Sequence, residues 1–377
     1  MQDIGHTLAQ APPSLLVEHL ATRLRDECGI TDVELLLVDY RLASLIPLGQ
    51  GPDDSDPPVR VPSDPPWRCF DEQAPVVAGP ALYLPVTTRG ERLGVLRLAP
   101  ADATQAVALA NVGQVLGHQL TAARASTDRY LIGARTRRLT LAAEMQWEIL
   151  PGRSLSTSEF TLAGQLEPAY AVRGDTFDWS SNVDKLSIAM LNGMGEGVAA
   201  ASLSILATSA LRNARRAGLA LVDQAALADA AIYAHHHGDQ YISALLLEFE
   251  LSTGRLTGVD TGAPLVLVAR GDALEELTFP SCDPLGMFDG SHFAASSYQL
   301  EPGDRLVIVS DGVHQAMSGS RRYGEADLTR LVRRTRSLPP LDVVRTQIGE
   351  LAAFVDGPLA DDAAIVCLDW HGAPAVQ

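Results

Sequence analysis

Apolar and polar positions in the first third of the chain alternate in ways that predict a mixed α and β unit. Apolar residues recur at helical spacing over residues 13–31, where Gly29 is placed to end the helix. Residues 32–48 are typical of a strand, a turn and a second strand. Two β-rich runs around Arg89-Gly90 predict a hairpin, and residues 102–124 predict a closing helix.

The stretch 51–67 is rich in proline and aspartate and predicts a long loop between the two hairpins. The resulting order is helix, hairpin, long loop, hairpin, helix, and the second hairpin reads "LYLPVTTRGERLGVLRL". Over residues 12–125 this order resembles GAF-type sensory domains. The resemblance implies a domain that binds a small ligand or mediates dimers, although no residue identifies the ligand.

Residues 126–150 predict one partly amphipathic helix, because apolar residues such as Leu131, Leu139 and Ile149 punctuate a charged sequence. Pro151 and Gly152 end it. We therefore expect a connecting segment over 126–152, which either couples two domains or is a solvated linker.

Beyond Ser154 the pattern changes to repeated strands separated by short turns that contain glycine or aspartate, which favours antiparallel pairing. The expected strands are "FTLAGQLEPAYAV", "DKLSIAMLNG", "QYISALLLEFEL", "GRLTGVDTG", "PLVLVARG", "HFAASSYQL", "DRLVIVSDG" and "DAAIVCLDW". The expected helices span 197–217, 221–237, 325–335 and 340–354. The fold class is therefore α+β, with a sandwich of two antiparallel sheets flanked by helices over residues 153–372.

Charge and hydropathy narrow the range of partners. The formal net charge is −17 and no long basic run occurs, which argues against nucleic acid or an anionic membrane surface as a ligand. No apolar stretch reaches the roughly 18 residues of a membrane span, and the N-terminus lacks the pattern of a signal peptide. We expect a cytoplasmic protein whose partners are proteins, metal cations or small molecules.

Several acidic residues lie beside glycine or alanine where predicted strands begin or end. They are Asp175, Asp178, Asp311, Asp361 and Asp362. Hard cations such as Mg²⁺ and Mn²⁺ bind oxygen ligands, and carboxylates that converge in the fold can supply them. A single Asp-Gly pair is more often a turn, so the candidate metal site depends on their combination.

Six motifs occur in a fixed order: "AVRGDTFDW", "LNGMGEGVAAA", "VDTGAPLVLVARG", "DPLGM", "LEPGDRLVIVSDGVHQA" and "DDAAIVCL". In this order the chain, over about residues 140 to 370, resembles the PPM-type metal-dependent serine/threonine phosphatases. It is most similar to their bacterial branch, typified by sporulation protein E and by the stress-response phosphatases that act on anti-sigma-factor antagonists.

The resemblance implies two Mn²⁺ or Mg²⁺ ions and a water that attacks phosphorus. Carried over by motif, the catalytic residues are Asp175, Asp311 and Asp361. The implied metal ligands are these three with Asn192 and the Gly193 carbonyl. The residues in supporting positions are Gly174, Asp178, Glu196, Asp260, Gly312 and Asp362.

Three motifs depart from the family pattern. Asn192 replaces the aspartate that bridges both ions, Arg173 replaces the first glycine of the Gly-Gly-Asp motif, and the usual "NAGH" reads "DTGA" at 260–263. Loss of one unit charge at contact distance weakens cation binding by about 4 kcal/mol at an effective dielectric near 20. Glu196 and Asp260 are the carboxylates that could restore that charge.

Two functions remain open on the sequence. One is a phosphatase that acts on a regulatory phosphoprotein, for example an anti-sigma-factor antagonist, under control of a small-molecule or protein signal at the sensor domain. The other is a pseudophosphatase, a signalling scaffold that binds a partner without turnover because of Asn192. In either case the apolar stripe of 126–150 predicts a homodimer, and the resemblance to the family implies the same state.

Overall fold

The computed structural model describes residues 4–50, 60–168, 172–262, 264–355, 357 and 359–373. The chain forms two compact units, Met1–Arg138 and Leu139–Gln377. The break between them lies within the predicted connecting segment 126–152, while the predicted domain borders themselves stay predictions.

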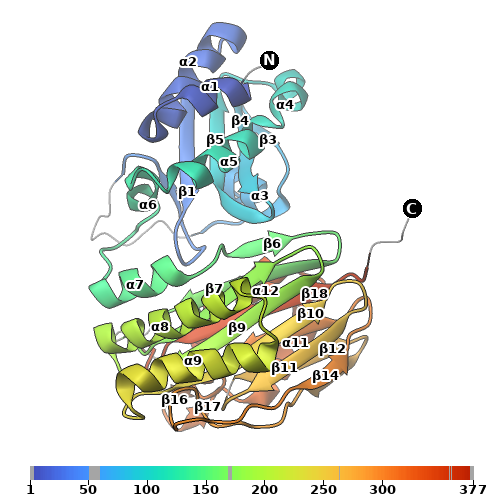
Figure 1. Cartoon of the computed structure of the whole chain (residues 1–377). Coiled ribbons are helices and arrows are strands. Elements are labelled where there is room, and N and C mark those ends of the chain that lie inside the picture. Colours follow the sequence, from blue (N-terminus) through green and yellow to red (C-terminus); the bar gives the residue numbers. More distant parts are fainter. Residues whose placement is uncertain are drawn as a thin grey trace. The chain divides into compact units, whose positions relative to one another are not determined.

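The N-terminal unit is built on a five-stranded antiparallel sheet with the strand order β2-β1-β5-β4-β3 (Figure 1). Its strands are β1 (Asp32–Val38), β2 (Leu45–Pro47), β3 (Val76–Ala78), β4 (Ala81–Thr88) and β5 (Glu91–Ala99). Its helices are α1 (Ile4–Gln10), the 3₁₀ helix η1 (Pro13–Leu15), α2 (Leu16–Cys28), α3 (Pro65–Glu72), α4 (Ala103–Leu109), α5 (Val112–Ala123) and α6 (Arg129–Gly133). Helix α5 contacts β4 closely, and glycine at position 113 permits this contact. A Cβ on Gly113 would lie 2.1 Å from the Pro85 carbonyl oxygen.

Turn chemistry explains the elements that were predicted in this unit. Gly29 ends α2 in the left-handed conformation, with φ of 70°. Arg89 and Gly90 both have positive φ, 50° and 91°, as a two-residue hairpin turn between β4 and β5 requires. The predicted helix end and hairpin are confirmed, and the GAF-type assignment stays a prediction.

The predicted loop 51–67 is only partly described, because residues 51–59 lie outside the described residues. Its last part was wrongly predicted as loop, since α3 begins at Pro65. Proline suits the first turn of a helix because its missing N–H has no intrahelical partner there.

The single helix predicted over 126–150 is also wrong. The chain forms α6 in the N-terminal unit and α7 (Leu141–Ile149) in the C-terminal unit, with residues 134–140 outside any helix. Residues 134–140 are mostly polar, and their two apolar side chains pack against different clusters, Ala134 in the N-terminal unit and Leu139 in the C-terminal unit. A new helix begins where the Thr140 hydroxyl accepts the Ala143 N–H at 3.2 Å.

The C-terminal unit contains two antiparallel sheets that pack face to face, which confirms the predicted sandwich (Figure 1). The five-stranded sheet, in the order β14-β11-β10-β9-β8, consists of β8 (Asp175–Ser181), β9 (Lys185–Gly193), β10 (Ile242–Glu250), β11 (Arg255–Asp260) and β14 (Ser296–Gln299). The six-stranded sheet, in the order β13-β12-β15-β18-β7-β6, consists of β6 (Ser154–Ser156), β7 (Phe160–Glu167), β12 (Leu265–Arg270), β13 (Ala273–Glu276), β15 (Arg305–Val309) and β18 (Ala363–Trp370). A short hairpin joins β16 (Met317–Ser318) to β17 (Arg321–Arg322).

Each of the eight predicted strands is present, although the end of the first candidate, residues 169–171, lies outside the described residues. Strand β8 was missed, because "DTFDWSS" carries two aspartates and was interpreted as a motif at a strand end. The predicted helices are present as α8 (Gly197–Arg216), α9 (Leu221–His236), α11 (Glu325–Arg334) and α12 (Pro340–Phe354), and a short helix α10 (Asp311–His314) follows β15.

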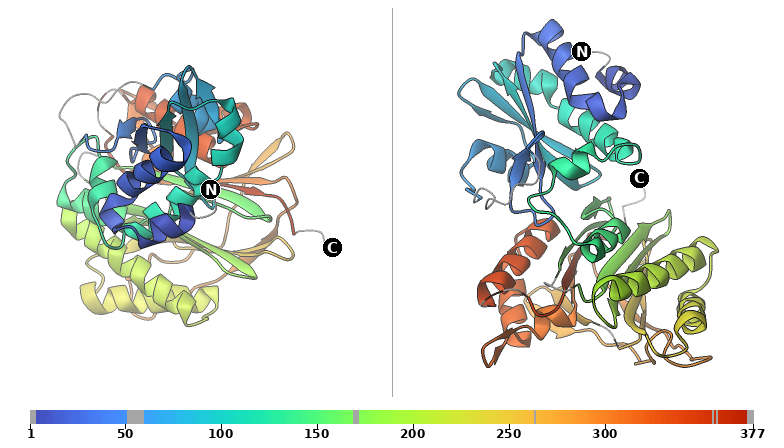
Figure 2. Two further views of the ribbon diagram at one scale, coloured as in Figure 1. Left: turned by 90° about the horizontal axis from the view of Figure 1, so that it is seen from above. Right: turned by 90° about the vertical axis from the view of Figure 1, so that its left-hand side faces the viewer.

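The helices of this unit cover the outer faces of the two sheets. Helices α8 and α9 pack on the five-stranded sheet, where Leu203 and Ile232 join the buried cluster around Leu191. Figure 2 shows α11 and α12 on the opposite flank, outside the six-stranded sheet. In the part of the chain that the structure describes, no helix is long and apolar enough to cross a membrane.

Alternating side chains of both sheets fill the space between them. On β9 the inward row contains Leu186, Ile188 and Met190, and comparable rows run along β15 and β18. Since side chains alternate along a strand, the next inward positions at one rim are Asn192 on β9, Ser310 after β15 and Asp362 before β18. The apolar core of the sandwich therefore gives way to polar residues at this rim.

Candidate functional site

Asp175 is a fully buried acid at this rim. Strand pairing places it directly opposite Asn192, which is in turn opposite Ser243 on β10, so the three residues share one face of the five-stranded sheet. Asp175 has no exposed surface, and neither carboxylate oxygen has a hydrogen-bond partner among the described residues. Burial raises the pKa of Asp175 well above its usual range, and the charges of the nearby carboxylates add to the shift.

Asp311 and Asp361 reach the same rim from the six-stranded sheet. Asp311 follows β15, and its Oδ1 accepts hydrogen bonds from Asn192 Nδ2 at 2.7 Å and from the Gly312 N–H at 3.0 Å. Asp361 precedes β18, where burial and then the charge of Asp311 raise its pKa to about 6. The like-charged neighbours make ionisation of each carboxyl costly.

Asp362 has a different position from Asp361, although the two are adjacent. Its Oδ2 accepts the backbone N–H groups of Arg173 and Gly174 at 2.8 and 2.9 Å and the Gln146 amide at 2.7 Å. The carboxylate is fully buried. Asp362 therefore holds the turn that leads into Asp175, which indicates a positioning role for this residue.

Three glycines of the predicted motifs are required by close backbone contacts. Gly174 has φ of 95°, and a Cβ on it would lie 2.9 Å from the Gly193 carbonyl oxygen. A Cβ on Gly193 would lie 2.9 Å from Ser204 Oγ, and one on Gly312 would lie 1.9 Å from the Asp362 carbonyl oxygen. The glycines let β8 approach β9, β9 approach α8, and the start of α10 approach the residues before β18.

Three of the supporting candidates have other surroundings. Asp178 is on the opposite face of β8, where Arg212 and Arg215 of α8 bind its two carboxylate oxygens at 2.8 and 3.1 Å. Glu196 is exposed at the start of α8. Asp260 ends β11 and accepts the Gly262 N–H at 2.9 Å, and Ala263 of the same motif lies outside the described residues.

A pocket of about 150 Å³ lies beside Asn192 and Asp311. Its lining includes Ser243, Ser310 and His314, which are not among the residues carried over by motif. The inward alternation of β10 and β15 could have indicated the two serines. No sequence signal pointed to Gln146, whose contacts with Asp175 and Asp362 arise only from the packing of α7. Burial lowers the pKa of His314, whose Nδ1 lies 3.1 Å from the Ser310 carbonyl oxygen.

The chemistry of the residues at this rim suits a cation, but their present arrangement does not. A fully buried carboxyl group with two unpartnered oxygens is stabilised either by protonation or by a cation, and Asp175 has no positive partner among the described residues. Within the described ranges no group of three or more His, Cys, Asp or Glu is already arranged to hold a metal, and the Asn192 amide occupies one oxygen of Asp311. Asp175, Asp311 and Asp361 are the residues that would hold a cation at this rim, and in the described structure their side chains are not yet arranged to do so.

A helix-flanked sandwich of two antiparallel sheets, with aspartates from both sheets at one rim, defines the class of PPM-type phosphatase domains. The family model of stage II sporulation protein E (SpoIIE) matches residues 182–371, and the chain belongs to this family. The resemblance inferred from the six motifs is confirmed.

Two characterised proteins are similar in sequence. The phosphoserine phosphatase RsbP of Bacillus subtilis (strain 168) is 25% identical over 133 residues, which are 34% of this chain and 33% of RsbP. Protein IcfG of Synechocystis sp. is 22% identical over 268 residues, 63% of this chain and 42% of IcfG. The chain thus spans less than half the length of either relative.

Solved structures share the fold. One is the PP2C phosphatase domain of SpoIIE from Bacillus subtilis with a fragment of its regulatory domain, 19% identical, with a TM-score of 0.51 over 58% of this chain and 66% of that chain. Another contains the RsbU and RsbW domains of Rv1364c from Mycobacterium tuberculosis, 20% identical, with a TM-score of 0.50 over 60% of this chain and 64% of that chain. At these identities the likeness establishes the fold alone.

Proposed function

We propose that the chain is a metal-dependent phosphatase that hydrolyses phosphoserine or phosphothreonine in a regulatory protein. The observation that carries this proposal is the buried, unpartnered carboxylate of Asp175 beside Asp311 and Asp361. When its carboxyl groups are ionised, such a cluster is unfavourable without a cation, and it lies at the rim where a pocket opens. Membership of the SpoIIE family supports the same activity.

Mn²⁺ or Mg²⁺ is the cofactor of this proposal. Asp175, Asp311 and Asp361 would hold it, with the Gly193 carbonyl and the Asn192 side chain as neutral oxygen donors. A divalent ion at such a site supplies charge for the phosphoryl oxygens and lowers the pKa of a bound water. Asp362 orients the Gly174-Asp175 turn, and Ser204 Oγ donates to the Gly174 carbonyl at 2.5 Å, so the ligand-bearing strand is fixed from both sides.

A pseudophosphatase is the second candidate, and one contact favours it. Asn192 Nδ2 donates a hydrogen bond to Asp311 Oδ1 at 2.7 Å, so a neutral donor stabilises this carboxylate where a cation would otherwise bind. In that case the domain keeps its fold, binds a partner protein and releases no phosphate.

Hydrolysis of p-nitrophenyl phosphate and of a phosphoserine peptide, with and without Mn²⁺, separates the two candidates. Wild-type turnover that requires Mn²⁺ and disappears in Asp311→Ala supports the phosphatase. Wild-type inactivity with activity gained in Asn192→Asp supports the pseudophosphatase. Inactivity of both proteins, with no Mn²⁺ binding by calorimetry, contradicts the metal-dependent proposal.

The N-terminal unit is proposed to be a GAF-like sensor that controls the phosphatase and contributes to a homodimer in the cytoplasm. Support comes from its five-stranded sheet with α2 and α5 packed into the same buried cluster, and from the order of its elements. The proposed substrate is a phosphorylated regulatory protein such as an anti-sigma-factor antagonist, in line with the name of RsbP as a phosphoserine phosphatase. Sedimentation velocity of the full chain at tens of micromolar tests the dimer, and a monomer contradicts it.

A further inference from the structure

One short segment of this acidic protein is strongly basic. Residues 321–336 contain six arginines and two acids, a net charge of +4, whereas the whole chain carries −17. The other 361 residues therefore carry −21. The arginines are Arg321, Arg322, Arg330, Arg333, Arg334 and Arg336, and they are called the arginine surface below.

The fold exposes most of these side chains together. On α11, Arg330, Arg333 and Arg334 are three and four residues apart, so they lie on one side of the helix and line a shallow depression there. The side chains of Arg330 and Arg334 are 66% and 57% exposed. Leu328 and Leu331 on the other side of α11 are buried.

Contacts connect the arginine surface to the candidate site. Arg322 Nε donates to the His314 carbonyl at 3.1 Å, and His314 lines the pocket beside Asp311. Arg321 and Arg330 both donate to Asp327 Oδ1, which places the hairpin arginine next to α11.

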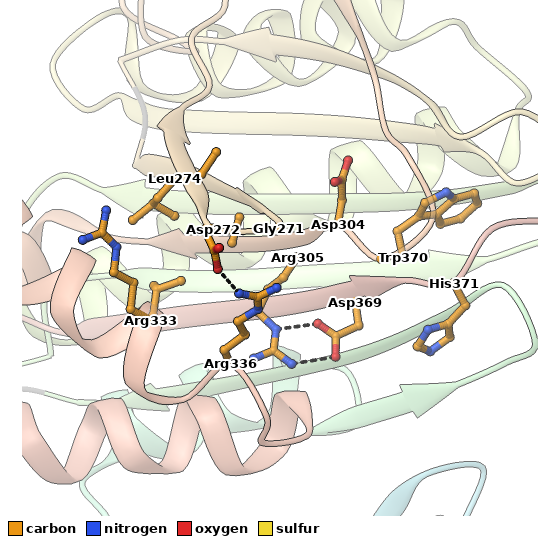
Figure 3. Close-up of a pocket in the computed structure, with 14 residues that line it drawn as sticks. Gly271, Asp272, Leu274, Asp304, Arg305, Arg333, Arg336, Asp369, Trp370 and His371 are labelled. Atoms are coloured by element: carbon orange, nitrogen blue, oxygen red, sulfur yellow. Dashed lines mark hydrogen bonds and ion pairs between the residues drawn. The ribbon is translucent and has the colours of Figure 1, made fainter.

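At its other end the arginine surface continues into a pocket of about 660 Å³. Arg333 lines this pocket as well as the depression on α11, and Arg336 lines it too. Figure 3 shows both side chains extending from the same segment, with Arg336 directed to Asp272. Arg333 is thus shared by the depression on α11 and this pocket, while Arg322 connects the arginine surface to the candidate site.

The acids nearby do not neutralise this surface. Asp327 serves two arginines, while Glu350 pairs with Arg334 and Asp272 pairs with Arg336. Arg333 has no ion pair in the described part of the chain. Glu325 also lines the depression on α11. Four carboxylates thus face six guanidinium groups, and an excess of positive charge remains at the protein surface.

We propose that the arginine surface docks an acidic segment of the phosphoprotein whose phosphorylated residue enters the site beside Asp311. The inference rests on the proposed function and names the chemistry of its substrate. Guanidinium groups form paired hydrogen bonds with carboxylates, which suits an acidic peptide. The negative charge on the rest of the chain disfavours a long polyanion such as nucleic acid.

Binding is measured apart from catalysis. The probe is a fluorescein-labelled peptide with glutamates on both sides of one phosphoserine, and its anisotropy is followed with the full chain in EDTA at low salt. The triple variant Arg330→Gln, Arg333→Gln, Arg334→Gln should bind the probe at least about tenfold more weakly. A matched variant, Arg25→Gln, Arg68→Gln, Arg216→Gln, removes the same charge from exposed positions elsewhere and should change binding by less than about twofold.

Further comparisons exclude simpler causes. Replacement of the peptide glutamates by glutamine should weaken binding to wild type as strongly as the triple variant does. The lysine version, Arg330→Lys, Arg333→Lys, Arg334→Lys, should keep at least part of the binding and shows that the helix tolerates substitution. Equal loss in the matched variant, equal binding of the glutamine peptide, or tighter binding of duplex DNA or phosphatidylserine vesicles than of the peptide overturns the proposal.

A catalytic measurement then links docking to turnover. With Mn²⁺, the triple variant should lose about tenfold in kcat/KM for the acidic peptide and keep its rate on p-nitrophenyl phosphate. A parallel loss on both substrates contradicts docking. Absence of wild-type turnover on both substrates contradicts the proposed phosphatase, whereas the anisotropy measurements still decide on docking.

Discussion

The two ends of the six-stranded sheet treat their acidic residues in opposite ways. At the start of β15, Asp304 accepts Arg270 at 2.6 and 2.9 Å, and at the end of β18, Asp369 accepts Arg305 at 2.5 and 2.7 Å. At the other end of the same two strands, Asp311 and Asp361 have no ion pair among the described residues.

The difference distinguishes a structural acid from an acid kept for function. A partly or fully buried carboxylate is normally paired, because its desolvation is otherwise uncompensated. The pKa of Asp361 is raised to about 6 by burial and by the charge of Asp311, and burial raises that of Asp175 well above its usual range. The carboxylates without arginine partners thus mark the end of the sandwich where a cation would be gained.

Asp175→Asn should have the largest effect, because it removes a carboxylate from the end of the sandwich where the acids lack arginine partners. The variant should lose Mn²⁺-dependent hydrolysis by at least about a thousandfold, because a charge in contact with the cation contributes about 4 kcal/mol. It should also raise the Tm in EDTA, since a buried carboxyl is replaced by a neutral amide. The matched variant Asp178→Asn, which breaks the ion pairs to Arg212 and Arg215, should lower the Tm and keep the Mn²⁺ response. If both variants change the Tm and the Mn²⁺ response in the same way, the distinction between a structural and a functional aspartate is wrong.

Asn192→Asp adds one more carboxylate to the rim that contains Asp175, Asp311 and Asp361. Calorimetry should show Mn²⁺ binding tightened by about a hundredfold, somewhat less than the full charge effect because the new carboxylate is repelled by Asp175 and Asp311. The Tm in EDTA should fall, because the hydrogen bond to Asp311 is lost. Asn182→Asp, in the turn between β8 and β9, is the control and should leave Mn²⁺ affinity unchanged.

Arg305→Met tests the paired end. The free energy of unfolding in urea should fall by about 2 kcal/mol, below the usual value for a buried pair because Asp369 keeps some exposure. Mn²⁺ affinity should not change. The double variant Arg305→Met, Asp369→Leu should recover part of the stability, and failure to recover any would mean that the guanidinium acts mainly through the carbonyls of Thr335 and Leu338.

The smallest expected effect is a pH dependence. Because the pKa of Asp361 rises from about 4 in the unfolded chain to about 6 in the fold, the folded state binds its proton more tightly. In EDTA, protonation of Asp361 stabilises the fold fully below about pH 4, and this contribution is lost as the pH rises through about 6. The difference in Tm between wild type and Asp361→Asn, measured from pH 4 to 7, should follow this course. A constant difference would show that Asp361 titrates normally.

Much of the C-terminal fold could be predicted from the sequence because its strands are strongly apolar and its turns contain glycine or aspartate. The functions of single aspartates could not be separated in the same way. Asp175 and Asp178 lie three residues apart, so in a strand they face opposite sides, but "DTFDWSS" is too polar to be identified as a strand. The arginine partners of Asp178 come from α8, and no local pattern encodes that contact.

The adjacent residues Asp361 and Asp362 have a consequence for mutational scans of this protein. Asp361 faces the candidate site, whereas Asp362 binds backbone N–H groups of the turn before β8. A screen for loss of signalling would score substitutions at both positions alike. A parallel screen for protein abundance in the cell would separate them, with the first variants present at normal levels and the second removed by proteolysis.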